Sequence, residues 1–135
     1  MTTAYSLNKI QTAKNSAKHH VIYDNICLEL STIDILKYIK IYKGHIKASN
    51  VVDLKKEPCV KIGEPNIVGL QLLIDVESKV VQFFAITSAT KGYGDKMVSS
   101  VIRSVPDDWK IIVFMDFSHG FWTVMSDRYP RLIVV

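Results

Sequence analysis

The sequence predicts an α/β (α+β) domain whose mixed, mainly antiparallel sheet is flanked by helices. Residues 80–87 are β-branched and aromatic, without Gly or Pro, which is typical of a strand. The apolar residues of 94–105 recur at the spacing of one helix face. With 135 residues, of which 48% are hydrophobic, the chain is long enough for one core but not for two. We therefore expect a single domain over residues 1–135, with residues 1–18 as a loosely ordered arm.

The first third of the chain predicts a strand followed by a helix. The apolar run at 20–30 is typical of a strand. Ser31 is a suitable N-cap, and Asp34 stands at the third helical position as an acidic variant of the capping box. The apolar residues that follow favour an amphipathic helix that ends near Gly44, a residue type common just beyond helix ends.

The middle of the chain predicts an antiparallel meander. A short strand is expected at 50–54. Strands at 58–64 and 66–75 then flank a turn rich in Gly, Pro and Asn. A second turn at 75–79 leads into the strand at 80–87.

The C-terminal third predicts further strands around the helix at 94–105. This helix stops before Pro106, because a residue that precedes proline disfavours helical geometry. Residues 109–116 are strongly β-prone, and a short strand at 131–135 follows near the end of the sequence.

The loop between the strand at 80–87 and the next helix predicts an anion site. Gly92 and Gly94 let the backbone approach a ligand closely and adopt positive φ angles. The first N–H groups of a helix lack intrahelical acceptors and lie at the positive end of its dipole. Lys91 and Lys96 add positive charge. A phosphate or pyrophosphate is the expected guest, and a tight turn without a ligand is the alternative that the residues alone leave open.

The same stretch resembles a known family. FFAITS at 83–88, followed by KGYG at 91–94, resembles motif A of the GCN5-related N-acetyltransferase (GNAT) superfamily, in wording closest to its histone acetyltransferase branch. Ala89 stands where that motif has Gln or Arg. Residues 118–130 resemble a later helix of the family, and the resemblance covers about residues 63–135.

The resemblance implies a GNAT-like fold that binds acetyl-CoA as co-substrate, with the pyrophosphate held by backbone amides of the loop. It implies the following cofactor-binding residues: Phe84, Ala85, Ile86, Lys91, Gly92, Tyr93, Gly94, Asp95 and Lys96.

The family's two catalytic side chains are replaced in this chain. Its base position falls on Val80 and its acid position on Trp122, neither of which exchanges a proton at useful pH. Tyr129 is the best remaining candidate for the acid, and Glu77 is a substitute for the base.

Two functions follow from the resemblance. The first is an acetyl-CoA-dependent N-acyltransferase that acts on a primary amine, either a protein lysine or a small amine. The second is a non-catalytic or degenerate member that binds CoA or a protein partner, encoded by a phage or a mobile element. Whether the chain is an active enzyme, which acceptor it uses and whether it forms a homodimer stay open at this point.

Composition and charge limit the classes of ligand and partner that we expect. The net charge of +4 suits an acidic cofactor, whereas the lysines of the first third alternate with apolar residues and disfavour nucleic acid. The two cysteines, Cys27 and Cys59, and the four histidines have no metal-binding spacing, so we expect no metal. No apolar run approaches the roughly 18 residues of a membrane-spanning helix, and we expect a cytoplasmic protein.

Overall fold

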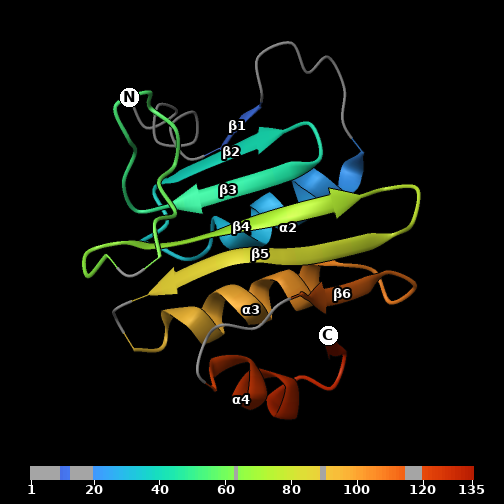
Figure 1. Cartoon of the computed structure of the whole chain (residues 1–135). Helices are drawn as coiled ribbons and strands as arrows, with labels where there is room; N and C mark the ends of the chain where they lie inside the picture. Colours follow the sequence, from blue (N-terminus) through green and yellow to red (C-terminus); the bar gives the residue numbers. More distant parts are fainter. Residues whose placement is uncertain (1–9, 13–19, 63, 89–90, 115–119) are drawn as a thin grey trace.

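The fold is a mixed sheet with helices packed on one face. The computed structural model describes residues 10–12, 20–62, 64–88, 91–114 and 120–135. In the described residues the sheet has seven strands, and their order in space follows the sequence (Figure 1). The elements in chain order are β1 (Ile10–Thr12), α2 (Val21–Leu30), β2 (Tyr38–Tyr42), β3 (His45–Ser49), β4 (Val68–Asp75), β5 (Val80–Ser88), α3 (Tyr93–Ser104), β6 (Lys110–Val113), α4 (Phe121–Arg128) and β7 (Leu132–Val134).

The predicted α+β class with a mixed sheet is confirmed. In the described residues the three pairings among β2, β3, β4 and β5 are antiparallel, and they form the longest ladders. The outer pairings, β1 with β2, β5 with β6 and β6 with β7, are parallel. Strand β1 lies within the predicted arm at 1–18 and forms an edge of the sheet.

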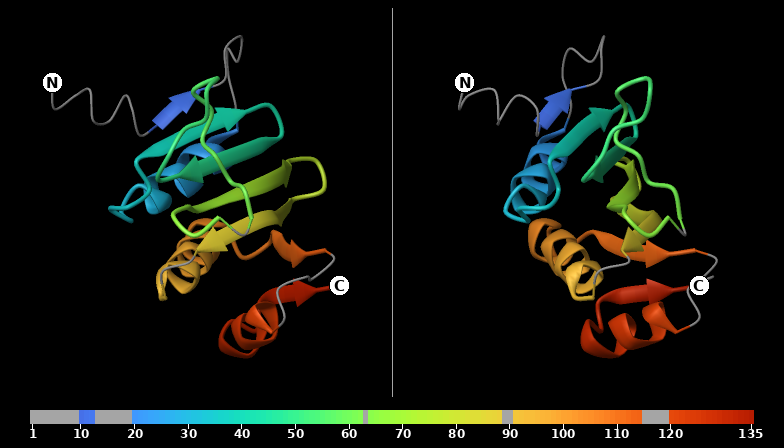
Figure 2. Two further views of the ribbon diagram at one scale, coloured as in Figure 1. Left: turned by 60° about the vertical axis from the view of Figure 1, so that its left-hand side comes forward. Right: turned by 90° about the vertical axis from the view of Figure 1, so that its left-hand side faces the viewer.

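The core lies between the sheet and its helices. Helices α2 and α3 lie side by side on one face, here called the helix face (Figure 2), and Arg103 of α3 pairs with Glu29 of α2 at 3.2 Å. Helix α4 adds Trp122, whose ring lies 5.0 Å from that of Phe83 on β5. None of the described helices is both long and apolar enough to span a bilayer.

The predicted elements of the second half are present in the predicted order. The strand at 80–87 corresponds to β5, and the helix at 94–105 corresponds to α3. The strand at 66–75 contains β4, that at 109–116 contains β6, the helix at 118–130 contains α4, and the strand at 131–135 contains β7. Residues 115–119 lie outside the described part of the chain.

The strand predicted at 20–30 is wrong, because this segment is helix α2. His20 is the N-cap, and its Nδ1 accepts a hydrogen bond from the N–H of Ile22 at 3.0 Å. An apolar run of this length fits a buried strand or a helix. Here the buried residues recur at helical spacing: Ile22, Tyr23, Ile26, Cys27 and Leu30. Burial raises the pKa of the Cys27 thiol to about 12, as expected for a desolvated side chain.

The helix predicted to end near Gly44 is also wrong, because the hairpin β2–β3 occupies this region. Tyr42 pairs with His45, which leaves a two-residue turn between them. Gly44 has a φ of +83°, which glycine adopts without strain. Strand β2 alternates buried and half-buried residues, which is the period of a strand. Ser31 is the C-cap of α2 rather than an N-cap.

The strands predicted at 50–54 and 58–64 are wrong as well. An isolated bridge joins Val52 to Pro58, and neither segment enters the sheet in the described residues. We call residues 50–62 and 64–67 the strap. The strap crosses the face of the sheet opposite the helices, here called the outer face (Figure 2).

Candidate functional site

The sheet divides between β5 and β6. Their parallel ladder ends at the pair Phe83–Val113, while β5 continues to Ser88. The β4–β5 register shifts at the same place, because Leu72 pairs with Phe83 but Gln71 pairs with Ala85. Phe84 is thus an extra residue in a β-bulge. We call this place, where the ladder stops beside the bulge, the fork.

The bulge changes which residues of β5 face the helices. Before it, Val81 and Phe83 are buried on the helix face. A regular strand would continue that face with Ala85 and Thr87. One inserted residue moves the alternation by one position, so Ile86 and Ser88 face the helices instead. The bulge therefore shapes one wall of a cleft.

The cleft has a volume of about 770 Å³ and lies between the end of β5, the start of α3 and helix α4. That size is typical of a small-molecule site. Three elements line it: β5 with Ile86 and Ser88, the β5–α3 junction with Lys91, Gly92, Gly94 and Asp95, and α4 with Gly120, Phe121, Val124, Met125 and Arg128.

Two helices begin at this cleft with glycine N-caps. Gly92 precedes α3 with a φ of +97°, and Gly120 precedes α4 with a φ of +112°. Glycine adopts this conformation without strain and offers no side chain to cap the first N–H groups. Both N-termini thus direct positive dipole ends toward the cleft, and the exposed Lys91 adds a full charge. The arrangement favours an anionic ligand.

A carboxylate on the cleft wall is held by two partners. The Tyr129 hydroxyl donates to Asp95 Oδ1 at 2.7 Å, and Arg128 Nη1 lies 3.0 Å from the same oxygen. We call Asp95, Arg128 and Tyr129 the cleft cluster. Burial, followed by the hydrogen bond to Asp95, raises the pKa of Tyr129, so this phenol stays protonated at neutral pH. The cluster joins the end of α4 to the start of α3.

Gly94 has a packing role. A Cβ built at this position would lie 2.8 Å from Cε1 of Phe121. The absence of a side chain therefore lets the Phe121 ring close on the first turn of α3. A substitution at Gly94 displaces this ring whatever ligand the cleft holds, so such a variant is a poor probe of ligand binding.

The predicted site residues divide into two groups. Ile86, Lys91, Gly92, Gly94 and Asp95 line the cleft together. The other predicted cofactor residues are not among its lining residues: Phe84, Ala85, Tyr93 and Lys96.

The predicted catalytic residues also separate. Tyr129 reaches the cleft wall through Asp95. Glu77 is exposed in the β4–β5 turn, at the opposite end of β5 from Gly92, and the structure does not bring it to the cleft. Trp122, at the family's acid position, is buried against Phe83.

The side of the cleft formed by α4 was not predicted. Phe121, Val124, Met125 and Arg128 recur at steps of three, four and seven, which is one face of a helix. That spacing was visible in the sequence, but its partner surface on α3 was not.

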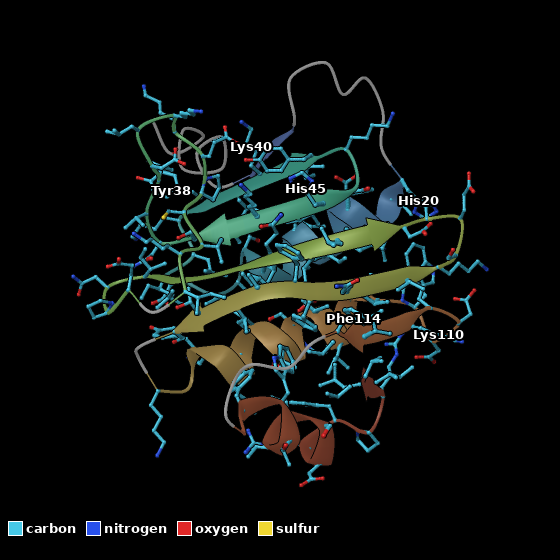
Figure 3. The ribbon with its side chains drawn as sticks, in the orientation of Figure 1. His20, Tyr38, Lys40, His45, Lys110 and Phe114 are labelled. Atoms are coloured by element: carbon cyan, nitrogen blue, oxygen red, sulfur yellow. The ribbon has the colours of Figure 1, made fainter. Side chains whose placement is uncertain are left out.

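A second carboxylate cluster lies on the outer face, away from the cleft. Glu57 of the strap accepts hydrogen bonds from the Tyr42 hydroxyl and from Lys40 Nζ, the latter at 2.5 Å. The His45 ring, which is labelled in Figure 3, stacks on Tyr42 with centroids 4.3 Å apart. We call Tyr42, Glu57 and Lys40 the strap cluster, because it fastens the strap to strand β2.

Comparisons with known protein families, with curated proteins and with solved structures found no match. In the described part of the chain, no three His, Cys, Asp or Glu residues come together as a metal site would require. The cleft's own geometry is therefore the basis for assigning a function.

Proposed function

We propose that the protein is an acyl-CoA-dependent N-acyltransferase with a GNAT-like fold, which transfers an acetyl group from acetyl-CoA to a primary amine. One observation carries the proposal. The β5–β6 ladder stops at a bulge, and β5 continues from there into a loop and helix start that favour an anion. A long ligand with an anionic end and an amide-containing arm fits that sequence of features. The cytoplasm is the proposed location.

The pyrophosphate of CoA is assigned to the amides that begin α3, beside Lys91 and Gly92. Backbone N–H groups at a helix start suit a diffuse, doubly charged group. Arg128 lies on the opposite wall of the cleft and contributes a second cation. The ligand's phosphate draws Arg128 partly away from Asp95.

The pantetheine arm is assigned to the side of β5 that faces the fork. Beyond the pair Phe83–Val113, no described residue of β6 pairs with β5. We assign the amides of the arm to the backbone of residues 84–87, where they bind as an added strand would. The bulge leaves a backbone N–H near Phe84 outside the ladder, and it polarises the thioester carbonyl.

Proton transfers pass through water rather than through side chains in this proposal. The Tyr129 hydroxyl donates to Asp95 at the end of the cleft assigned to the phosphates, which is remote from the thioester, so the leaving thiolate takes its proton from water. Glu77 is too remote from the cleft to serve as base, so the amine proton passes to water.

A second candidate is a CoA-binding module without turnover. Its support is the buried Trp122 at the family's acid position, since an indole ring packed on Phe83 cannot donate a proton to a thiolate. The two candidates share the cleft and differ in thiol release when acetyl-CoA is incubated with amines.

Calorimetric titration with CoA tests the shared part. Val124 and Thr123 are adjacent exposed residues of α4, but of the two only Val124 lines the cleft. Val124→Glu places a carboxylate where the ligand's phosphate lies, and it should weaken binding at least tenfold. Thr123→Glu adds the same charge outside the cleft and should keep affinity within about twofold of the wild type. No heat with the wild type, or equal losses in both variants, contradicts the proposal.

A further inference from the structure

The fork carries two exposed aromatic side chains on the outer face. Phe84 is 59% exposed and Phe114 is 54% exposed. Each follows by one residue the last pair of the β5–β6 ladder, Phe83–Val113. Val113 is buried on the helix face, so Phe114, which follows it, points to the outer face. Phe84 is the extra residue of the bulge, and its ring is exposed beside the last pair of the ladder. Both rings therefore lie near the point where the strands part, with Phe114 at the end of β6 (Figure 3).

Two isoleucines and one glutamine lie on the same face near these rings. Along the outer face, Gln82 pairs with Ile112, and Ile112 pairs with Ile133, which is 43% exposed. This apolar patch contrasts with the outer face of β2 and β3, where Lys40, Tyr42 and His45 lie beside the strap. Phenyl groups that are more than half exposed at a break in a sheet contribute nothing to the core, and such exposure suggests a binding role.

We propose that Phe84 and Phe114 bind the aromatic body of the acceptor amine, so that the preferred acceptors are arylalkylamines rather than polyamines or lysine side chains. This inference rests on the proposed function, because the fork connects the patch with the cleft assigned to the thioester. An aryl group buries apolar surface between the two rings, and the ring faces attract the ammonium of the arriving amine. A polyamine would need several carboxylates, and among the described residues of the patch the polar one is the neutral Gln82.

The acceptor reacts through the fork. The ammonium loses a proton to water, and the nitrogen lone pair attacks the thioester carbonyl carbon. A carbon–nitrogen bond forms, the carbon–sulfur bond breaks, and the CoA thiolate leaves and takes up a proton. A second proton of the former ammonium is released from the tetrahedral adduct to water, and the third stays on the nitrogen of the neutral amide.

The test compares three acceptors with acetyl-CoA: 2-phenylethylamine, n-butylamine and spermidine, with thiol release as the readout. The wild type should use 2-phenylethylamine with a kcat/KM at least tenfold above that for the other two. Phe84→Ala and Phe114→Ala should each lower this value at least tenfold, mainly through KM, while CoA affinity stays within twofold in Phe114→Ala. Phe84→Leu keeps an apolar side chain and should lose less, and Leu54→Ala, at a fully exposed strap residue, should lose nothing.

The outcomes separate the two proposals. Equal use of n-butylamine or spermidine, or unchanged kinetics in both Phe→Ala variants, overturns the aromatic acceptor site and leaves the acyltransferase intact. If CoA gives no heat, the proposed function fails. Ligand-observed NMR with 2-phenylethylamine then tests the aromatic site independently of CoA. Binding that disappears in the Phe84→Ala, Phe114→Ala double variant supports the aromatic site, whereas no binding to the wild type overturns it.

Discussion

The molecule contains the same three-part arrangement twice, with different consequences. In the cleft cluster, Asp95 binds the Tyr129 hydroxyl and Arg128. In the strap cluster, Glu57 binds the Tyr42 hydroxyl and Lys40. Each is a carboxylate held by a phenol and a cation. One joins two helix ends at the edge of a cleft, and the other fastens a loop to a strand.

The surroundings decide the role of each cluster. Lys40 and Glu57 have side chains that are only 21% and 25% exposed. Removing either charge would therefore leave the other one desolvated without a partner. Arg128 and Asp95 are 50% and 37% exposed, and they face the cleft. A solvated pair exchanges partners at small cost, whereas a half-buried pair does not. We therefore assign ligand binding to the cleft cluster and stability to the strap cluster.

The largest effect that separates the clusters is expected from Arg128→Glu. The variant replaces the cation beside the ligand's phosphate with a second carboxylate next to Asp95. CoA affinity should fall by about 2 kcal/mol, or about 30-fold. Arg103→Glu is the matched control, because Arg103 is equally exposed and pairs with Glu29 away from the cleft. Calorimetry on both variants measures the difference, and comparable losses would remove the distinction.

Removal of Glu57 should give the second largest effect. It should lower the stability of the protein and leave CoA affinity unchanged. In Glu57→Ala the half-buried Lys40 and Tyr42 lose their acceptor, which should lower the free energy of unfolding by about 1–2 kcal/mol. Glu77→Ala, at an exposed turn residue, should change it by less than about 0.5 kcal/mol. Denaturant titration gives both values, and CoA affinity should be unchanged in each. A loss of CoA binding in folded Glu57→Ala would mean that the strap takes part in the site.

The stabilisation by Glu57 should also depend on pH, with a smaller effect than its removal. The Lys40 hydrogen bond, followed by that of Tyr42, lowers the pKa of Glu57 from its ordinary 4.5. The contribution is therefore complete above pH 4.5 and is lost as the pH falls through the folded-state pKa. Burial and Glu57 raise the pKa of Tyr42 above 10.0, so the contribution is also lost at high pH, as the pH rises through this raised value. The stability difference between wild type and Glu57→Gln should be flat between about pH 5 and pH 9 and shrink on both sides. A difference that grows on acidification would contradict this origin.

The smallest effect is expected at Lys91. Its charge is exposed, so Lys91→Ala should weaken CoA binding by about 0–1 kcal/mol, or at most about fivefold. Lys110→Ala removes an exposed lysine outside the cleft and should have no effect. Calorimetry under the same salt conditions compares the two. A loss above tenfold at Lys91 would show that side-chain charge, rather than backbone amides, holds the anion.

The β5–α3 half of the site could be predicted because the residues that form it are neighbours in the sequence. Strand, glycine loop and amphipathic helix follow one another within residues 80–105, and each pattern is local. The apolar run that became α2 was ambiguous, since a buried strand and a buried helix share that composition. Gly44 was misread because a glycine ends a helix and also forms a hairpin turn.

The other half of the site depends on tertiary structure. The Phe84 bulge is a property of the β4–β5 register, which no single segment encodes. The contact of Phe121 with Gly94 joins residues that only folding brings together. The cleft could therefore be located from one wall, but its second wall and the cleft cluster could not.

Amide chemical shifts during a CoA titration of the 15N-labelled protein test most directly the claim that the two clusters differ in role. We predict the largest changes at the N–H groups of Gly92, Gly94 and Gly120, where two helix starts meet the cleft. We predict no change at Glu57 or elsewhere in the strap. Changes centred on the strap, or none at saturating CoA, would contradict the assignment of the cleft as the ligand site.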